Sequence, residues 1–336
     1  MRAIVLEGPR RAVLRDVPEP RRAVGEVLIA VQRAGICGSD VAVFRGDRPV
    51  EHPLVMGHEA VGRIADPGES EHTPGSRVVI EPNIPCRRCD VCRRGHGNVC
   101  PSKRSLGMNW PGVFADLIAV PSEFAHPLPD RIRLEDAVGI EPLAVAWHAV
   151  AAAQVTEGSR VALIGCGAEG LLLVQALVAC GARVVAADLR AERLALARQL
   201  GAESTVHVSP GTRASVDARL VAPVVFEAAG AAAALELALN AAAPGGRIVA
   251  LGLGASTANL MPLDFVRRGL TLIGSLIYDH PTDFQAAIDM VHRGDIQPAA
   301  LVSQVIDKLE ALPAMLSSLA AHDTDGKTVV DIRGQA

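Results

Sequence analysis

The stretch RVALIGCGAEG, residues 160–170, decides the fold of the second half of the chain. It begins with an apolar run, which is typical of a strand buried on both faces of a parallel sheet. It ends in glycines at the G-x-G-x-x-G spacing, and Asp188 stands at the end of the next predicted strand. A strand, a glycine turn, a helix and an acidic residue, in this order, predict a dinucleotide-binding unit.

Each glycine of this motif is expected to have its own role. Gly165 would allow the tight turn, and Gly167 would let the backbone approach a pyrophosphate at the N-terminus of the helix. Gly170 would let the helix and the strand pack closely. A glycine-rich turn without a ligand is the alternative, and the spacing to Asp188 argues against it.

The acidic residue predicts which dinucleotide is bound. Asp188 would accept hydrogen bonds from the adenosine ribose hydroxyls and would repel a 2′-phosphate, so NAD is favoured over NADP. Arg190 and Arg193 follow closely in the sequence. Their positive charge keeps the 2′-phosphate open as an alternative, and Arg193 is therefore a candidate cofactor-binding residue.

Outward from this motif, predicted strands and helices alternate as far as residue 275. The further strands are expected at residues 183–188, 205–208, 224–228, 247–251 and 270–275. Such alternation predicts an α/β fold with a doubly wound parallel sheet. Beyond Tyr278 the pattern loosens into helices near 282–292 and 309–321 and a final strand at 328–332.

The first half of the chain has a different pattern. Residues 1–80 contain short β-branched or alternating runs broken by glycine and proline, which predict an irregular, barrel-like β domain. Residues 134–150 are expected to be helical. A chain of 336 residues is longer than one core usually serves, so two domains are expected.

Composition and charge exclude several classes of protein. Hydrophobic residues make up 49% of the chain and charged residues 21%, as in globular domains. The net charge of −4 comes with no basic block and only 3% aromatic residues, so no nucleic acid partner is expected. The longest apolar run, residues 171–180, is too short to span a bilayer, and the N-terminus lacks a signal-peptide pattern. We therefore expect a cytoplasmic protein without a membrane partner.

Four of the seven cysteines lie in a lobe at residues 82–104 that has almost no core-forming residues. Their order is Cys86-x2-Cys89-x2-Cys92-x7-Cys100, which brings four thiols within reach of one tetrahedral ion. Zinc with four thiolates is a closed structural site, and in such a lobe the metal replaces the missing core. Disulfides and an iron–sulfur cluster are the alternatives, and a reducing cytosol favours metal over disulfides.

A second group of metal-binding residue types lies upstream. Cys37, His58 and Glu59 offer a thiolate, an imidazole and a carboxylate, which zinc accepts at reactive sites. Taken singly, they could be a buried thiol, a core histidine and a surface carboxylate. Together with the cysteine lobe and the dinucleotide motif, they predict a catalytic zinc. Asp40 is expected to orient His58, and Ser39 to take the proton of an alcohol.

Glu141 is a further candidate at this metal. It begins an apolar helix, where an acidic side chain can simply favour the helix dipole. It also stands between the two expected domains, where a cleft must lie. A second carboxylate ligand would make the site anionic and a poorer Lewis acid, so we expect Glu141 to swing between the metal and its surroundings, in competition with Glu59.

These motifs together resemble the zinc-containing medium-chain dehydrogenase/reductase family over essentially the whole chain. The resemblance rests on Cys37-Gly38-Ser39-Asp40, Gly57-His58-Glu59, the four-cysteine lobe, the glycine motif and Asp188. It implies a GroES-like catalytic domain at residues 1–146, a Rossmann NAD-binding domain at 147–283 and a return to the catalytic domain at 284–336. It also implies two zinc ions per chain and reversible hydride transfer between NAD and an alcohol or carbonyl compound.

Within the family, Glu59 and Glu141-Pro142-Leu143 resemble the sorbitol-type and threonine-type dehydrogenases. Gly274-Ser275 and Tyr278 also resemble the sorbitol-type enzymes, although Ile277 replaces their usual arginine.

Another departure concerns the proton path. Ala42 stands where many relatives carry a relay histidine, so the proton must leave through Ser39, the ribose hydroxyls and water, or through His52 or His148. Lys327 corresponds to a basic residue that closes the cofactor cleft in the family.

The predicted function is therefore zinc-dependent hydride transfer between a polyol-like secondary alcohol, or its ketone, and NAD. An amino-alcohol or amino-cyclitol dehydrogenase is the first alternative. An epimerase that uses NAD without net redox change and a non-catalytic protein of the same fold are the others. The resemblance implies a homodimer or homotetramer, and the expected edge strand at 270–275 must be covered.

Overall fold

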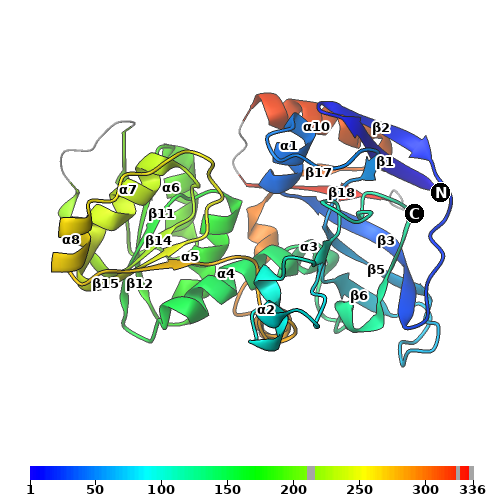
Figure 1. Cartoon of the computed structure of the whole chain (residues 1–336), viewed down its shortest axis with the longest axis horizontal. Coiled ribbons are helices and arrows are strands. Elements are labelled where there is room, and N and C mark those ends of the chain that lie inside the picture. The colour runs from blue at the N-terminus through cyan, green and yellow to red at the C-terminus, as the bar shows by residue number, and fades with distance from the viewer. Residues whose placement is uncertain (210–215, 323–325, 333–336) are drawn as a thin grey trace. The chain divides into compact units, whose positions relative to one another are not determined.

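The structure is a computed structural model and describes residues 1–209, 216–322 and 326–332 (Figure 1). The chain divides into two compact units: a first unit of Met1–Glu141 with Asp279–Ala336, and a second unit of Pro142–Tyr278. These divisions fall a few residues before the predicted boundaries at 146 and 283. The last four residues of the predicted segment 284–336 lie outside the described residues.

The second unit contains a parallel sheet. Its described strands pair in the order β13-β12-β11-β14-β15-β16, and each pairing is parallel. This is the strand order of a doubly wound dinucleotide fold, which reverses its direction of winding between β11 and β14. The strands are β11 (Arg160–Ile164), β12 (Arg183–Asp188), β13 (Ser204–His207), β14 (Ala222–Glu227), β15 (Ala242–Ala250) and β16 (Thr271–Gly274).

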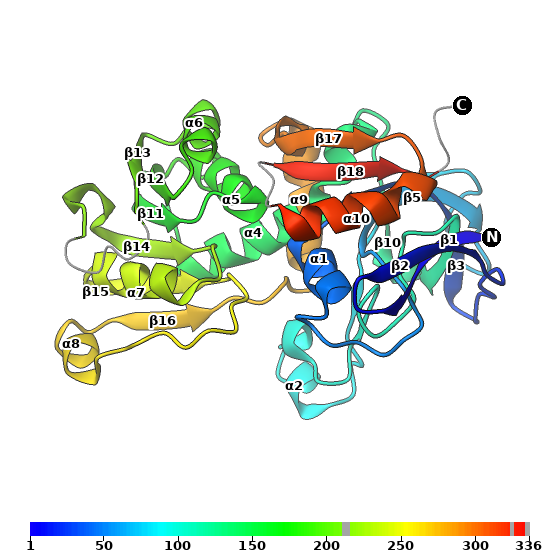
Figure 2. The same cartoon turned by 90° about the horizontal axis from the view of Figure 1, so that it is seen from above.

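Helices cover this sheet because their apolar side chains are buried by packing against it. Helix α5 is buried from Gly170 to Leu177 without a polar stripe, as expected for a helix inside a fold. Helices α5 and α6 pack on β12, while α7 packs on β14 and β15 (Figure 2). The helices are α5 (Ala168–Ala179), α6 (Ala191–Gln199), the short η3 (Ala218–Leu220), α7 (Ala232–Ala241) and α8 (Pro262–Arg267).

The first unit is rich in strands. Its largest sheet has the order β10-β6-β5-β3-β18-β17, with β9 also paired to β3, and two small sheets are β2-β1-β4 and β7-β8. The strands are β1 (Arg2–Gly8), β2 (Arg11–Asp16), β3 (Glu26–Ile36), β4 (Leu54–Val55), β5 (Glu59–Asp66), β6 (Arg77–Ile80), β7 (Asn83–Ile84), β8 (Arg104–Ser105), β9 (Leu117–Pro121), β10 (Ala125–Pro127), β17 (Val302–Ile306) and β18 (Lys327–Asp331).

The C-terminal part of the chain completes this unit. Strand β18 pairs antiparallel with β3, so that Val329 lies opposite Gly35, and α10 packs on α1 and β2 (Figure 2). The pairing places Lys327 next to the end of β3. The helices are α1 (Gly38–Arg45), α2 (Asp90–Arg93), η1 (Gly97–Val99), η2 (Ser122–Phe124), α3 (Leu134–Ala137), α9 (Thr282–Arg293), η4 (Pro298–Leu301), η5 (Leu309–Ala311) and α10 (Leu312–Ala321).

Two local expectations were wrong. Residues 38–45 form helix α1, although only strands were predicted before residue 80. The single helix expected at 134–150 is split into α3 and α4 (Ile140–Ala153). Gly139 lies at the break, where a side chain would run into Pro298 of η4.

No helix in the described part of the chain is both long and apolar enough to cross a membrane.

Candidate metal centres and dinucleotide site

Two neighbouring strands bring the first metal-binding group together. Cys37 directly follows β3 and caps the N-terminus of α1, while His58 directly precedes β5. Strands β3 and β5 are antiparallel, and Gly35 pairs with Glu59. The ligand atoms of Cys37, His58 and Glu59 consequently lie within 4.8 Å of one another.

Asp40 holds the imidazole of His58 in place. Its Oδ1 lies 2.9 Å from His58 Nδ1, and its Oδ2 accepts a hydrogen bond of 2.9 Å from the backbone N–H of Cys37. An ionised carboxylate can only accept, so Nδ1 carries a proton and Nε2 is the nitrogen left for a metal. One side chain therefore fixes both the thiol-bearing residue and the imidazole.

Ser39 lies between the two ligands. Its Oγ donates to Cys37 Sγ at 3.2 Å and lies 3.5 Å from His58 Nε2. The predicted proton acceptor thus adjoins the cluster, whereas the alternative relay residue His52 is exposed.

Glu59 is paired with a residue from the far end of the sequence. The carboxylate is fully buried, and Lys327 Nζ donates to Glu59 Oε1. Gly35 permits this arrangement because a side chain at that position would overlap Glu59 Oε2. The second oxygen, Oε2, is buried without a hydrogen-bond partner. One of the two oxygens of this buried carboxylate is therefore available for a further contact.

The charge of this cluster suits a cation. Burial lowers the pKa of His58, but Asp40 and Cys37 raise it, and the net pKa lies well above 6.5. Burial likewise lowers the pKa of Lys327, while Glu59 and Cys37 raise it, and its net pKa lies above the usual 10.5. A cluster that favours positive charge and has an unused buried carboxylate oxygen fits a zinc ion.

Glu141 is placed differently from the other candidates. It lies near the start of α4 and is buried, but the ligand atoms within 4.8 Å of one another come from Cys37, His58 and Glu59 and do not include it. Its negative charge contributes to the raised pKa of Lys327. The predicted exchange between Glu141 and Glu59 stays a prediction.

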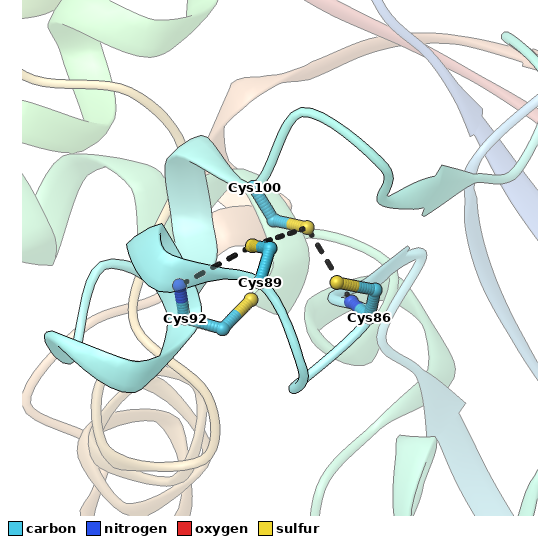
Figure 3. Close-up of side chains that lie close together, drawn as sticks. All are labelled: Cys86, Cys89, Cys92 and Cys100. Atoms are coloured by element: carbon cyan, nitrogen blue, oxygen red, sulfur yellow. Dashed lines mark hydrogen bonds between the residues drawn. The ribbon is translucent and has the colours of Figure 1, made fainter.

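The four cysteines of the lobe gather around one point (Figure 3). Their sulfur atoms lie within 4.8 Å of one another, and those of Cys89 and Cys100 are 3.8 Å apart. Helix α2 and η1, which carry this lobe, have no buried residues of their own. Four thiols without a surrounding core fit a closed zinc site, as the sequence predicts.

Backbone N–H groups stabilise the sulfur atoms of the lobe. The N–H of Cys86 donates to Cys100 Sγ at 3.4 Å, and the N–H of Cys92 donates to Cys89 Sγ at 3.4 Å. The N–H groups of Arg88 and Cys89 lower the pKa of Cys86 to about 6. These amide dipoles favour thiolate at the position where a metal requires it.

The nearby arginines are directed elsewhere. The side chain of Arg87 pairs with Glu123 at 2.8 Å, and Arg93 pairs with Asp90. Two arginines of the lobe therefore contact carboxylates.

The glycine motif forms the turn between β11 and α5. Gly165 has a φ of 98°, in the left-handed region that favours glycine. A side chain at Gly170 would overlap the backbone of Gly165, so helix and strand are in close contact there. At Gly167, by contrast, nothing lies within 4 Å of the position of a Cβ. The N-terminus of α5 is thus open on the side where a phosphate would approach.

Asp188 is tied to this turn at the end of β12. Its Oδ2 accepts from the N–H of Cys166 at 2.7 Å, and its Oδ1 accepts from the N–H of Arg190 at 2.9 Å. Burial and the Asp188 carboxylate raise the pKa of Cys166 to about 12, while Arg193 opposes the increase. The turn after β11 and Asp188 are therefore in direct contact, while Arg193, on α6, acts electrostatically on the same thiol as Asp188.

Sequence models of two protein families match the chain. Residues 23–130 match the alcohol dehydrogenase GroES-like domain, and residues 168–293 match a domain described as zinc-binding dehydrogenase. The first match contains both metal-binding groups, and the second contains Gly170 and Asp188.

Individual proteins match over almost the full length. D-xylulose reductase A of Aspergillus oryzae is 32% identical over 322 residues, which cover 90% of this chain and 89% of the relative. A structure described as a zinc-binding dehydrogenase of Sinorhizobium meliloti 1021, bound to NADP, has 30% identity and a TM-score of 0.89, with 98% of each chain covered. L-idonate 5-dehydrogenase of Escherichia coli has 26% identity and a TM-score of 0.89, also with 98% of each chain covered.

One family thus accounts for the strand-rich unit with its two cysteine-containing groups and for the parallel sheet with its glycine turn. The identity to D-xylulose reductase A extends over nine-tenths of the chain, and the fold agrees with two solved structures that each cover 98% of it. The chain belongs to the zinc-containing medium-chain dehydrogenase/reductase family.

Proposed function

We propose that the protein is a zinc-dependent polyol dehydrogenase that transfers a hydride between a sugar-alcohol-like secondary alcohol and NAD. The observation that carries this proposal is the cluster of Cys37, His58 and the fully buried Glu59 in a chain that also has a dinucleotide turn. The activities named for two relatives, D-xylulose reductase and L-idonate 5-dehydrogenase, support a polyol-type substrate.

Each side chain of the cluster has a distinct role in this proposal. Cys37, His58 and Glu59 would hold a zinc ion, which when bound supplies Lewis acidity that lowers the pKa of a substrate hydroxyl. Asp40 keeps Nε2 of His58 directed at the cluster. Ser39 Oγ, next to both the thiol and the imidazole, takes the hydroxyl proton. Because residue 42 is alanine, the proton continues through water.

The cofactor proposal rests on the turn after β11. Gly165, Gly167 and Gly170 would receive the pyrophosphate, with Asp188 and Arg193 near the adenosine ribose. The Sinorhizobium meliloti relative was solved with NADP. In this chain the carboxylate of Asp188 is fixed by two backbone N–H groups at the end of β12, and a 2′-phosphate there would meet its negative charge. We therefore propose NAD as the preferred cofactor.

The remaining parts of the chain support this assignment. Cys86, Cys89, Cys92 and Cys100 would hold a structural zinc. Residues 1–146 and 284–336 would form the catalytic domain, and residues 147–283 the NAD-binding domain. Four zinc-binding thiols require a reducing compartment, so the cytoplasm is the proposed location.

The same proposal includes a homo-oligomer. Strand β16 is an edge strand of the described sheet, and Leu272 on it is 40% exposed. Leu263 and Val266 of α8 are exposed as well. An edge strand with exposed apolar neighbours is suited to pairing with a second copy of the chain, which would give a homodimer or a larger assembly.

A substrate screen tests the proposal. The zinc-loaded protein is incubated with NAD or NADP and with polyols, cyclitols, amino alcohols or simple secondary alcohols, and reduction of the nicotinamide is followed by absorbance. We expect polyols with NAD to give the largest kcat/KM. A strong preference for amino alcohols would change the proposed substrate class from polyols to amino alcohols. No reduction of the nicotinamide with any alcohol would refute the proposed function.

A further inference from the structure

A third group of metal-binding side chains lies in the first unit, apart from the two zinc groups. It consists of Glu81, His126 and His280, whose ligand atoms lie within 4.8 Å of one another. Glu81 directly follows β6, and His126 belongs to β10, which pairs with β6. His280 lies two residues before α9, close to the point at Asp279 where the chain re-enters this unit. Three separate segments thus converge on one position.

Both imidazoles approach the same carboxylate oxygen. His126 Nε2 and His280 Nδ1 each lie 2.7 Å from Glu81 Oε2. Aromatic contacts fix the two rings: His280 stacks on Phe124 with ring centroids 4.3 Å apart, and His126 stacks on Phe284 with centroids 4.7 Å apart. Both nitrogens are therefore held facing the carboxylate.

One oxygen of Glu81 is unsatisfied. Its side chain is fully buried, and its Oε1 has no hydrogen-bond partner. Among the described residues, the two imidazoles are the groups that hydrogen bond to this carboxylate, and no lysine or arginine does so. A buried carboxylate is costly unless it is paired with positive charge or coordinates a metal, and here its partners are two imidazoles, which are metal-binding groups.

We propose that Glu81, His126 and His280 form a third metal site, which binds a zinc-type divalent transition ion through two nitrogens and one carboxylate. Two histidines and a glutamate are a known zinc ligand set, and imidazole favours late transition metals over magnesium and calcium. Tetrahedral zinc places neighbouring ligand atoms roughly 3.3 Å apart, so small outward shifts of the two rings would admit the ion.

The ion would have a structural consequence. It would neutralise the buried carboxylate, engage its free oxygen or leave that oxygen to a water, and tie the start of α9 to strands β6 and β10. This site contains no sulfur, in contrast to the cysteine lobe and to the cluster at Cys37. That difference gives the site its own spectroscopic signature, independent of enzymatic activity.

The first test counts bound ions. The full chain is dialysed against a weak chelator and titrated with zinc at micromolar free concentration, and bound zinc is measured by mass spectrometry. We expect three zinc ions per wild-type chain and two for His280→Gln. His207→Gln, which alters an exposed histidine on β13, is the matched control and should retain three. A wild-type chain that saturates at two ions would overturn the proposal, as would a third ion bound equally by His280→Gln.

The second test needs no variant. Cobalt replaces zinc stepwise in the wild-type chain, and absorbance is recorded. Cobalt at the two cysteine-containing sites gives thiolate-to-cobalt charge-transfer bands, whereas a site of two imidazoles and a carboxylate adds only d–d absorption. We expect a final equivalent that increases the d–d bands without increasing charge transfer. If no such equivalent is found, the three side chains share a proton instead of a metal, and the proposal fails.

Discussion

The cysteine lobe and the Cys37 cluster belong to the same unit, yet their surroundings are opposite. The lobe runs through α2 and η1, which contain no buried residues, and only Cys100 of its four cysteines is buried. The Cys37 cluster comes from the ends of β3 and β5 in the main sheet, and Glu59 is fully buried. In the lobe the ion would replace a core, whereas at Cys37 an existing core positions the ligands.

This contrast is the reason why, of these two groups, we propose chemistry only at Cys37. Four thiolates complete the coordination of zinc and leave no place for a substrate oxygen. The Cys37 cluster has three ligand types, a hydroxyl at Ser39 and a cationic neighbour at Lys327. A metal held by a rigid sheet can have an incomplete ligand set without loss of the fold. If this is correct, loss of the lobe ion should lower stability, and loss of the ion at Cys37 should lower activity.

The largest effect is expected from Cys100→Ala. With three thiolates the lobe should lose its zinc, and because it has no core, residues 86–100 should unfold. The free energy at stake is the apparent zinc-binding energy, on the order of 10 kcal/mol in small zinc-dependent folds. Zinc content should fall by one ion per chain, and limited proteolysis should cut within the lobe. Cys180→Ala, at the end of α5, is the control and should keep all zinc. Unchanged zinc content in Cys100→Ala would refute a structural zinc there.

Cys37→Ala should lower activity and leave stability almost unchanged. The sheet supports its surroundings, so the thermal midpoint should change little and the lobe should keep its zinc. Loss of the Lewis acid should reduce kcat/KM by roughly 10³-fold or more, equivalent to about 4 kcal/mol. Circular dichroism, zinc content and NAD reduction measure the three quantities. A fully active enzyme with one zinc fewer would show that the reaction does not use this cluster.

Local patterns in the sequence were sufficient to predict much of the difference between the cysteine lobe and the Cys37 cluster. The spacing of Cys86 to Cys100 and the glycine motif each lie within a short stretch, where chain connectivity alone brings the groups together. Alternation of strands and helices predicted the parallel sheet, because a crossover helix between adjacent strands leaves few other arrangements. The same reasoning placed Asp40, three residues after Cys37, near Cys37 and His58.

Contacts between distant segments could not be predicted in this way. Lys327 contacts Glu59 because β18 returns beside β3, and no local pattern encodes that register. His280 approaches Glu81 for a similar reason. The resemblance related Lys327 to the cofactor cleft, which stays a prediction, and the structure adds the contact of its amine with Glu59. Helix α1 was missed because its residues, 38–45, have a weak amphipathic pattern.

Lys327→Met tests whether Lys327 and zinc both stabilise the buried carboxylate of Glu59. Removing the cation leaves Glu59 buried without a partner, which costs about 3 kcal/mol or more when one half of a buried pair is lost. A zinc ion on Glu59 would replace the missing charge, so the destabilisation should be larger without zinc than with it. Urea unfolding of the variant and the wild type, each with zinc and with a chelator, measures the difference. Lys308→Met, at an exposed lysine, is the control. Equal destabilisation in both conditions would show that zinc and Lys327 do not share Glu59.

The smallest effect is expected from Asp40→Asn, which keeps the shape of the side chain and removes its charge. Asp40 accepts hydrogen bonds from both Cys37 N–H and His58 Nδ1, but an amide has only one acceptor oxygen. One of the two bonds must therefore be lost, and either loss loosens a zinc ligand. Groups that orient metal ligands typically contribute 10–100-fold to metal affinity, which is about 1.4 to 2.7 kcal/mol.

Competition with a chromophoric chelator separates the ion at Cys37 from the ion of the cysteine lobe in the Asp40→Asn protein. The ion at Cys37 should be released first, at 10–100-fold lower chelator concentration than in the wild type, while the lobe ion is unchanged. Asp90→Asn, which removes an exposed carboxylate from α2 inside the lobe, is the matched control and should leave both affinities unchanged. Equal release of the Cys37 ion in both proteins would mean that the sheet alone positions the ligands. A loss of both ions in Asp40→Asn would mean that the two regions are not energetically separate, and the contrast between them would no longer hold.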